Sequence, residues 1–152
     1  MARPRGDVYG PSAAKRAKGR KAVGLAGNGG DEAFIRYYIQ RINDASRMSD
    51  PTLLDPLTGP DCPGCRPLTD FISANASAGT HVDGDMWEVQ RTITQTFDAT
   101  SAGVIVTISQ RPARIVDRDG RSVDVLRANQ GDRLMTLSFG AVWRLDRVQM
   151  VG

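Results

Sequence analysis

The sequence is poor in the residues that most often bind metals or carry redox chemistry. Its 152 residues include two cysteines, Cys62 and Cys65, and a single histidine, His81. A structural zinc site takes about four Cys or His ligands, and these three residues fall short of that set. We therefore predict no metal site and no cofactor.

Long apolar runs are also missing. No stretch approaches the roughly 18–20 apolar residues that a membrane-spanning helix needs, and the weakly apolar segment 22–27 is shorter than the apolar region of a secretory signal. We expect neither a membrane span nor a signal peptide in the sequence as it stands. Hydrophobic residues make up 40% and charged residues 24% of the chain, which is ordinary for a globular domain.

The positive net charge of +3 comes from one end of the chain. Residues 1–21 carry seven basic side chains and one acidic side chain, whereas residues 22–152 carry 13 basic and 16 acidic side chains. Residues 1–30 also contain seven glycines and few large apolar side chains, so packing cannot offset the entropy lost on ordering them. We predict a flexible basic arm at residues 1–30 and a single domain at residues 31–152.

The arm suggests a weak, nonspecific contact between residues 1–21 and polyanions, which salt would weaken. The alternative is a solvated linker, because blocks of like charge are commonly disordered tails.

Three segments before residue 80 predict helices. Apolar residues recur at three- and four-residue intervals from Phe34 to Ala45, after Asp31 as the capping residue. Asp50-Pro51 is a second start signal. A third helix is predicted from about Cys65 to the small residues at 74–79.

After Gly84 the apolar period changes from about 3.6 residues to 2, which predicts β-strands. The first strand covers residues 87–97, and others follow at about 104–108, 135–139 and 143–148. The predicted fold class is α+β, with three N-terminal helices packed on a strongly curved antiparallel sheet of four to six strands.

A hairpin is predicted between the second and third of these strands. Asp119-Gly120 suits a two-residue type I′ turn joining residues 113–118 to 121–126. This register places Val116 opposite Val123.

Three short segments resemble a known family. They are residues 32–39 (Glu-Ala-Phe-Ile-Arg-Tyr-Tyr-Ile), residues 57–65 with their Asp-Cys-Pro-Gly-Cys ending, and the closing Trp143-Arg144-Leu145. Together they resemble an uncharacterised domain family of actinobacterial lipoproteins, a branch of the nuclear-transport-factor-two-like superfamily that includes SnoaL-like cones. The resemblance implies a cone-shaped fold, with helices on one face of a bent sheet and a pocket at the open end. It also implies an extracytoplasmic or membrane-tethered location, although family members usually follow a lipobox signal and this chain starts with a basic arm.

Cys62 and Cys65 flank Pro63-Gly64 just before the third predicted helix, and three interpretations compete. A redox motif would need a thioredoxin-like βαβ setting, and a zinc site would need further ligands. A structural disulfide needs only a turn that brings the two α-carbons close together. We predict the disulfide, which would persist in an oxidising compartment.

The cone implies a pocket, and four aromatic residues are expected to line it: Tyr38, Trp87, Phe97 and Trp143. Aromatic residues at such spacings more often pack in a core, which is the alternative interpretation. We predict no catalytic residue.

The resulting hypothesis is a non-catalytic accessory or ligand-binding domain, exported or surface-tethered, with a small apolar ligand in the cone pocket. The first alternative is a small-molecule isomerase, dehydratase or cyclase, with Asp70, Asp98, His81 and Tyr38 as its acid and base groups. The second alternative is an interaction domain that forms a homodimer through its sheet face.

Overall fold

The structure, a computed structural model, describes residues 29–151. The predicted arm at residues 1–30 therefore lies outside the described residues, apart from Gly29 and Gly30. The three predicted helical segments are present as α1 (Gly30–Met48), η1 (Pro51–Leu57) and α2 (Arg66–Ala78). The middle segment is a 3₁₀ helix of seven residues, with Pro51 in its first turn and Pro56 inside it.

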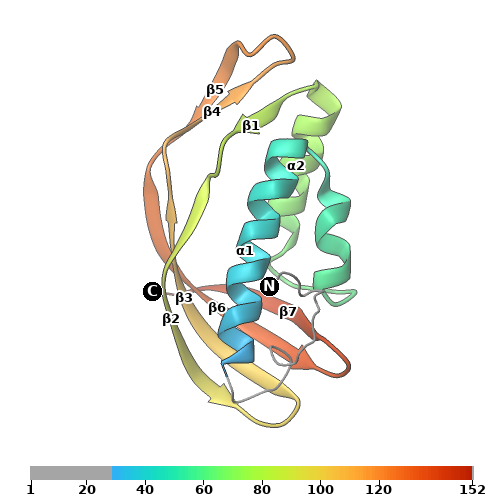
Figure 1. Ribbon diagram of the computed structural model, residues 1–152, viewed down its shortest axis with the longest axis vertical. Coiled ribbons are helices and arrows are strands. Elements are labelled where there is room, and N and C mark those ends of the chain that lie inside the picture. Colours follow the sequence, from blue (N-terminus) through green and yellow to red (C-terminus); the bar gives the residue numbers. More distant parts are fainter. Residues whose placement is uncertain (1–28, 152) are drawn as a thin grey trace.

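The described strands form two antiparallel sheets (Figure 1). The larger sheet has the order β2-β3-β6-β7, from strands Trp87–Phe97, Ser101–Gln110, Asn129–Phe139 and Trp143–Val151. The smaller sheet has the order β1-β4-β5, from strands His81–Asp83, Ala113–Val116 and Ser122–Leu126. These seven strands exceed the predicted four to six, because β1, a three-residue strand that was not predicted, pairs with β4.

The long strands curve around α1, and α2 and η1 lie on the same side of the sheets (Figure 1). The inward side chains of β3 and β6, including Val104, Val106 and Leu137, are fully buried against the apolar face of α1. Burying one such side chain contributes roughly 1.5–3 kcal/mol to stability, so this layer of contacts holds the fold together. The predicted α+β cone is confirmed.

The start of α1 differs from the prediction. Gly29, in the left-handed region at φ 77°, occupies the capping position that was expected for Asp31. Asp31 is buried instead, and one of its carboxylate oxygens lies 2.6 Å from the hydroxyl of Thr94 on β2. The carboxylate of Glu32 lies 3.0 Å from the same hydroxyl. Two acidic residues thus face the positive end of the helix dipole and connect α1 to the sheet.

The register of the β4–β5 hairpin is as predicted from Ala113 to Ile115 and differs at Val116. Val116 pairs with Ser122, not Val123, because the ladder shifts by one residue between Ile115 and Val116. The turn is longer than the predicted two residues: the N–H of Gly120 donates to the carbonyl of Asp117 over 3.0 Å. The side chain of Asp117 accepts the N–H groups of residues 119 and 121, and this local bonding favours the longer turn.

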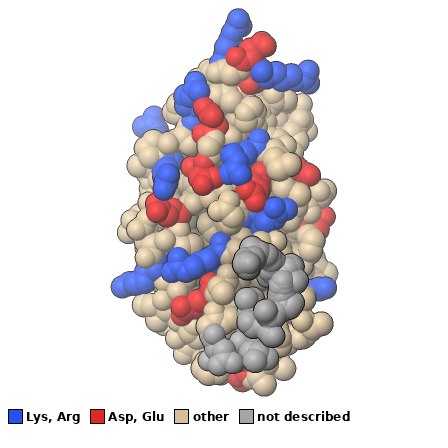
Figure 2. Space-filling model, viewed as in Figure 1, with Lys and Arg blue, Asp and Glu red and all other residues tan. Residues whose placement is uncertain are grey.

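Basic and acidic side chains alternate over the face seen in Figure 2, without a large area of one sign. This face therefore offers no electrostatic footprint for a nucleic acid. None of the helices within residues 29–151 is long and apolar enough to cross a membrane.

Candidate functional site

A cavity of about 390 Å³ lies between α1, the start of α2 and the inner face of the larger sheet. Its size falls in the lower part of the roughly 300–1,000 Å³ range of small-molecule sites. Most of its wall is apolar, with Ile42, Leu68, Phe71, Ile108, Met135 and Val148 contributed by five different elements.

Four residues bring polar atoms to the cavity, namely Tyr38, Trp87, Gln110 and Arg133. No aspartate, glutamate or histidine is among the described residues that line it. The cavity therefore combines an apolar body with hydrogen-bond donors and one positive charge.

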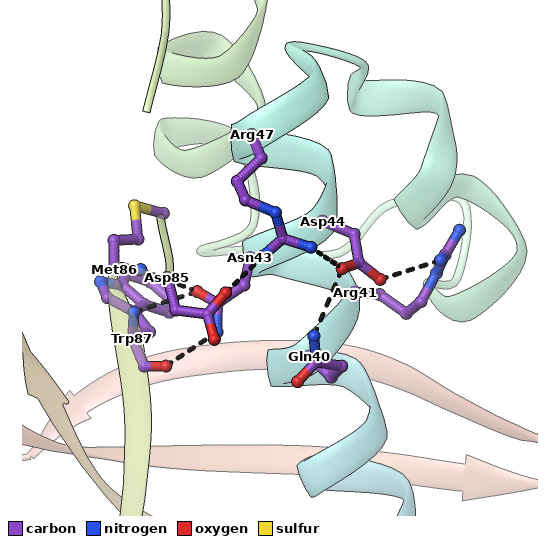
Figure 3. Close-up of polar contacts among 8 residues, drawn as sticks. All are labelled: Gln40, Arg41, Asn43, Asp44, Arg47, Asp85, Met86 and Trp87. Carbon is purple, nitrogen blue, oxygen red and sulfur yellow. Dashed lines mark hydrogen bonds and ion pairs between the residues drawn. The ribbon is translucent and has the colours of Figure 1, made fainter. Parts of the chain in front are cut away.

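Trp87 is held in place by an asparagine of α1 (Figure 3). The side-chain amide of Asn43 donates to the carbonyl of Trp87 over 2.9 Å, and its oxygen accepts the N–H groups of Met86 (3.2 Å) and Trp87 (3.0 Å). The indole N–H of Trp87 donates to Gln110 over 3.2 Å. Both the backbone and the ring of Trp87 are thus fixed at the point where β2 begins.

Charged residues surround this contact on the solvent side (Figure 3). Asp44 pairs with Arg41 at 3.0 Å and with Arg47 at 2.5 Å, and Arg47 also pairs with Asp85 just before β2. Pairs this close to solvent contribute only about 0–1 kcal/mol each. The buried amide of Asn43 is therefore the stronger connection between α1 and β2.

Tyr38 lines the cavity from α1 and is only 3% exposed. Its ring stacks with Phe34 at a centroid distance of 6.4 Å. Its hydroxyl makes no hydrogen bond to any residue between 29 and 151. Burial raises the pKa of Tyr38 well above its ordinary value, so the hydroxyl stays protonated and remains a donor.

The raised pKa of Tyr38 predicts a loss of stability in alkali. Above pH 10 the unfolded chain ionises this phenol and the folded chain does not, so the unfolded state is favoured as the pH rises. At pH 11 this single group should cost about 1.4 kcal/mol relative to pH 9. Urea unfolding of the wild type and of Tyr38→Phe at both pH values measures it. A wild type that loses no more stability than the variant would contradict the prediction.

The predicted disulfide between Cys62 and Cys65 is present, with a Cα–Cα distance of 5.5 Å. Gly64 and Cys65 line the cavity, and the carbonyl of Pro63 accepts the N–H of Val148 on β7 over 2.9 Å. The disulfide loop, residues 62–65, is therefore one wall of the cavity and leads directly into α2.

Of the four aromatic residues expected at the pocket, Tyr38 and Trp87 line the cavity, whereas Phe97 and Trp143 lie elsewhere. Phe97 is at the far end of β2 and is 60% exposed. Trp143 is 4% exposed in the core, where its ring contacts Phe139 at 4.9 Å. Strands β2 and β7 are long, so residues at their two ends do not share one pocket.

Two residues with polar side chains that line the cavity, Gln110 and Arg133, were not predicted from the sequence. Arg133 had a readable signal, because it stands two residues before Met135 and four before Leu137, in the inward phase of an apolar alternation. Gln110 had the same signal, because it stands two residues after Ile108 and four after Val106, in the inward phase of β3.

The candidate acid and base groups do not converge. Asp70 is exposed on α2, and His81 lies on β1. Asp98 is exposed after β2, where the backbone N–H of Thr100 at 2.8 Å holds the pKa of its carboxyl below the ordinary value. Among these candidates only Tyr38 lines the cavity. The described part of the chain also contains no group of three or more His, Cys, Asp or Glu side chains placed to hold a metal ion.

The fold and the site together define an α+β cone domain with an apolar cavity. The sequence matches no protein-family profile and no curated protein. Among solved structures, the chain is similar to the intermembrane space region of the chloroplast protein ARC6, with a TM-score of 0.56 and 14% identity over 81% of this chain and 95% of that chain.

Two further similar structures have a TM-score of 0.51. One is an uncharacterised protein with a cystatin-like fold from Caulobacter vibrioides, 19% identical over 83% of this chain and 92% of that chain. The other is the beta subunit of the benzoate 1,2-dioxygenase from Burkholderia mallei, 11% identical over 80% of this chain and 87% of that chain. At these identities the likeness establishes the α+β cone fold alone.

Proposed function

We propose that this chain is a non-catalytic ligand-binding domain whose cone cavity binds a small apolar molecule. The observation that carries the proposal is the cavity of about 390 Å³, with its apolar walls and its few polar groups at fixed places. General acid–base catalysis uses a positioned carboxylate or imidazole in most enzymes, and the described lining contains neither.

An accessory role is part of this proposal. A dioxygenase beta subunit has the same cone, which supports a domain that works beside a partner. One fold can host many functions, so the cavity and not the fold supports the proposed binding role.

Binding of a neutral aromatic alcohol, 2-naphthalenemethanol, tests the proposal. The chain has two tryptophans, and Trp87 lines the cavity while Trp143 does not. In an NMR titration of ¹⁵N-labelled protein, the indole N–H signal of Trp87 should shift and saturate, and that of Trp143 should stay in place.

A blocking variant gives the control. Leu68→Trp adds bulk to the cavity wall on α2 and should abolish the saturable shift without unfolding the protein. A wild type with no saturable shift at Trp87 for either the alcohol or its carboxylate analogue 2-naphthoate, or a shift that survives in the blocked variant, would refute a binding function for this cavity.

We further propose an extracytoplasmic setting, as an exported or tethered domain of the actinobacterial lipoprotein kind. The disulfide supports it, since such bonds persist mainly in oxidising compartments. Protein isolated from its native host and treated with N-ethylmaleimide under denaturing, non-reducing conditions should gain no mass at Cys62 or Cys65. Two added groups would contradict this location.

A further inference from the structure

Arg133 is a charged side chain on the apolar side of the larger sheet. It stands opposite Val106 on β3 and Met150 on β7, in the same inward phase of β6 as Met135. Its side chain is partly buried and lines the cavity.

Within residues 29–151 the guanidinium of Arg133 has no ion pair and no hydrogen bond to a side chain or carbonyl. Its neighbour Asp132 belongs to the other face of the sheet, where it accepts the hydroxyl of Thr107 over 2.7 Å. A partly buried cation without a counter-charge is unfavourable unless an anion reaches it. The five N–H donors of Arg133 are therefore available to a ligand.

Gly131 gives the guanidinium its place beside the cavity. It precedes Arg133 on the same inner face, opposite Ile108 of the cavity wall. A Cβ atom at residue 131 would lie only 3.2 Å from Nη1 of Arg133, so any side chain there would crowd the guanidinium.

The polar side chains that line the cavity offer a ligand more hydrogen-bond donors than acceptors. Gln110 is already engaged on both sides, because it accepts from Trp87 and donates to the carbonyl of Arg127 over 2.8 Å. Tyr38, a residue that is 3% exposed and lines the cavity, supplies a second free donor, its neutral hydroxyl. A ligand that matches the site carries acceptors and a negative charge on an apolar body.

We propose that the cavity binds an apolar carboxylate, whose carboxylate group pairs with Arg133 while its apolar body fills the space in front of Tyr38 and Trp87. This inference rests on the proposed binding function and names the class of its ligand. An Arg–carboxylate pair can be bidentate, which gives the site orientation as well as affinity.

Two ligands with the same aromatic body separate the contributions: 2-naphthoate and 2-naphthalenemethanol. Isothermal titration at low salt should show that 2-naphthoate binds more tightly, on the order of tenfold. The preference should disappear in Arg133→Gln and survive in part in Arg133→Lys, which keeps the charge but not the planar fork. Gly131→Ala should reduce it by displacing the guanidinium.

The matched control is Arg147→Gln. Arg147 lies on β7 of the same sheet, opposite Thr136 and on the outer face, and it is exposed. This variant loses the same charge and should keep the full preference, which separates pairing in the cavity from the general effect of net charge.

The outcomes are distinct. Equal affinity of both ligands for the wild type, or a preference that persists in Arg133→Gln, would overturn the assignment of a carboxylate while leaving a binding cavity. Failure of both ligands to bind would overturn the proposed function and this inference with it. Circular dichroism of each variant confirms that the fold is intact before binding is measured.

Discussion

Alanine at position 64 should destabilise the protein by about 3–5 kcal/mol, a large part of a typical domain's stability. A Cβ atom on Gly64 would lie 1.9 Å from the carbonyl oxygen of Val148, and Gly64 adopts φ +87°. The loop cannot retreat easily, because the disulfide closes it and the hydrogen bond from Val148 to Pro63 holds it against β7. Urea unfolding of Gly64→Ala against the wild type measures the loss.

Gly84→Ala is the matched control for this variant. Gly84 also has a positive φ, +97°, but a Cβ atom there would meet no atom within 4 Å. Gly84→Ala should therefore lose only the stability that a non-glycine residue loses at positive φ, about 1–2 kcal/mol. Equal losses in the two variants would show that the approach to Val148 has no energetic weight.

Replacing Asn43 by leucine should cost about 3 kcal/mol of stability. The variant keeps the approximate volume of the side chain but leaves two N–H groups and one carbonyl at Met86 and Trp87 without their partner. Asn43 is 3% exposed, so water cannot easily replace the amide. The measurement is again urea unfolding, followed by the naphthalene titration, in which affinity should fall because Trp87 is no longer fixed.

Gln40→Leu on the same helix gives the comparison. Its amide donates to Asp44 over 3.3 Å at the exposed surface, so its loss should change stability by less than about 0.5 kcal/mol. If Asn43→Leu were as mild as Gln40→Leu, the amide of Asn43 would not be the connection between α1 and β2.

The elements that depend on repeated apolar spacing could be predicted from the sequence. The helix from Phe34 to Ala45 and the strands β6 and β7 each bury one face, and that face sets the period of the apolar residues. The disulfide was also predictable, because Cys62 and Cys65 have no other partners in the sequence.

Features that depend on contacts between distant segments could not be predicted in this way. Trp87 and Phe97 both belong to the alternating apolar pattern of β2, but they lie at its opposite ends. Only Trp87 lies at the end that forms the cavity with α2. The close approach of Gly64 to Val148 joins residues 84 positions apart. The turn at Asp117 was missed because a side-chain carboxylate, bonded to two N–H groups, overrode the preference of Asp119-Gly120.

The disulfide loop also bears on how fast a ligand exchanges. The loop is a covalent ring of four residues, and a hydrogen bond joins it to Val148. We therefore expect the loop to move together with β7 and not as a separate flap. Met150, a lining side chain on β7 opposite Arg133, is 73% exposed. Methionine is unbranched and changes rotamer readily, and exposed side chains do so within picoseconds to nanoseconds. For the carboxylate proposed above, entry and exit past Met150 would therefore need no opening of the backbone, and its residence time would be set by the strength of its contacts inside the cavity.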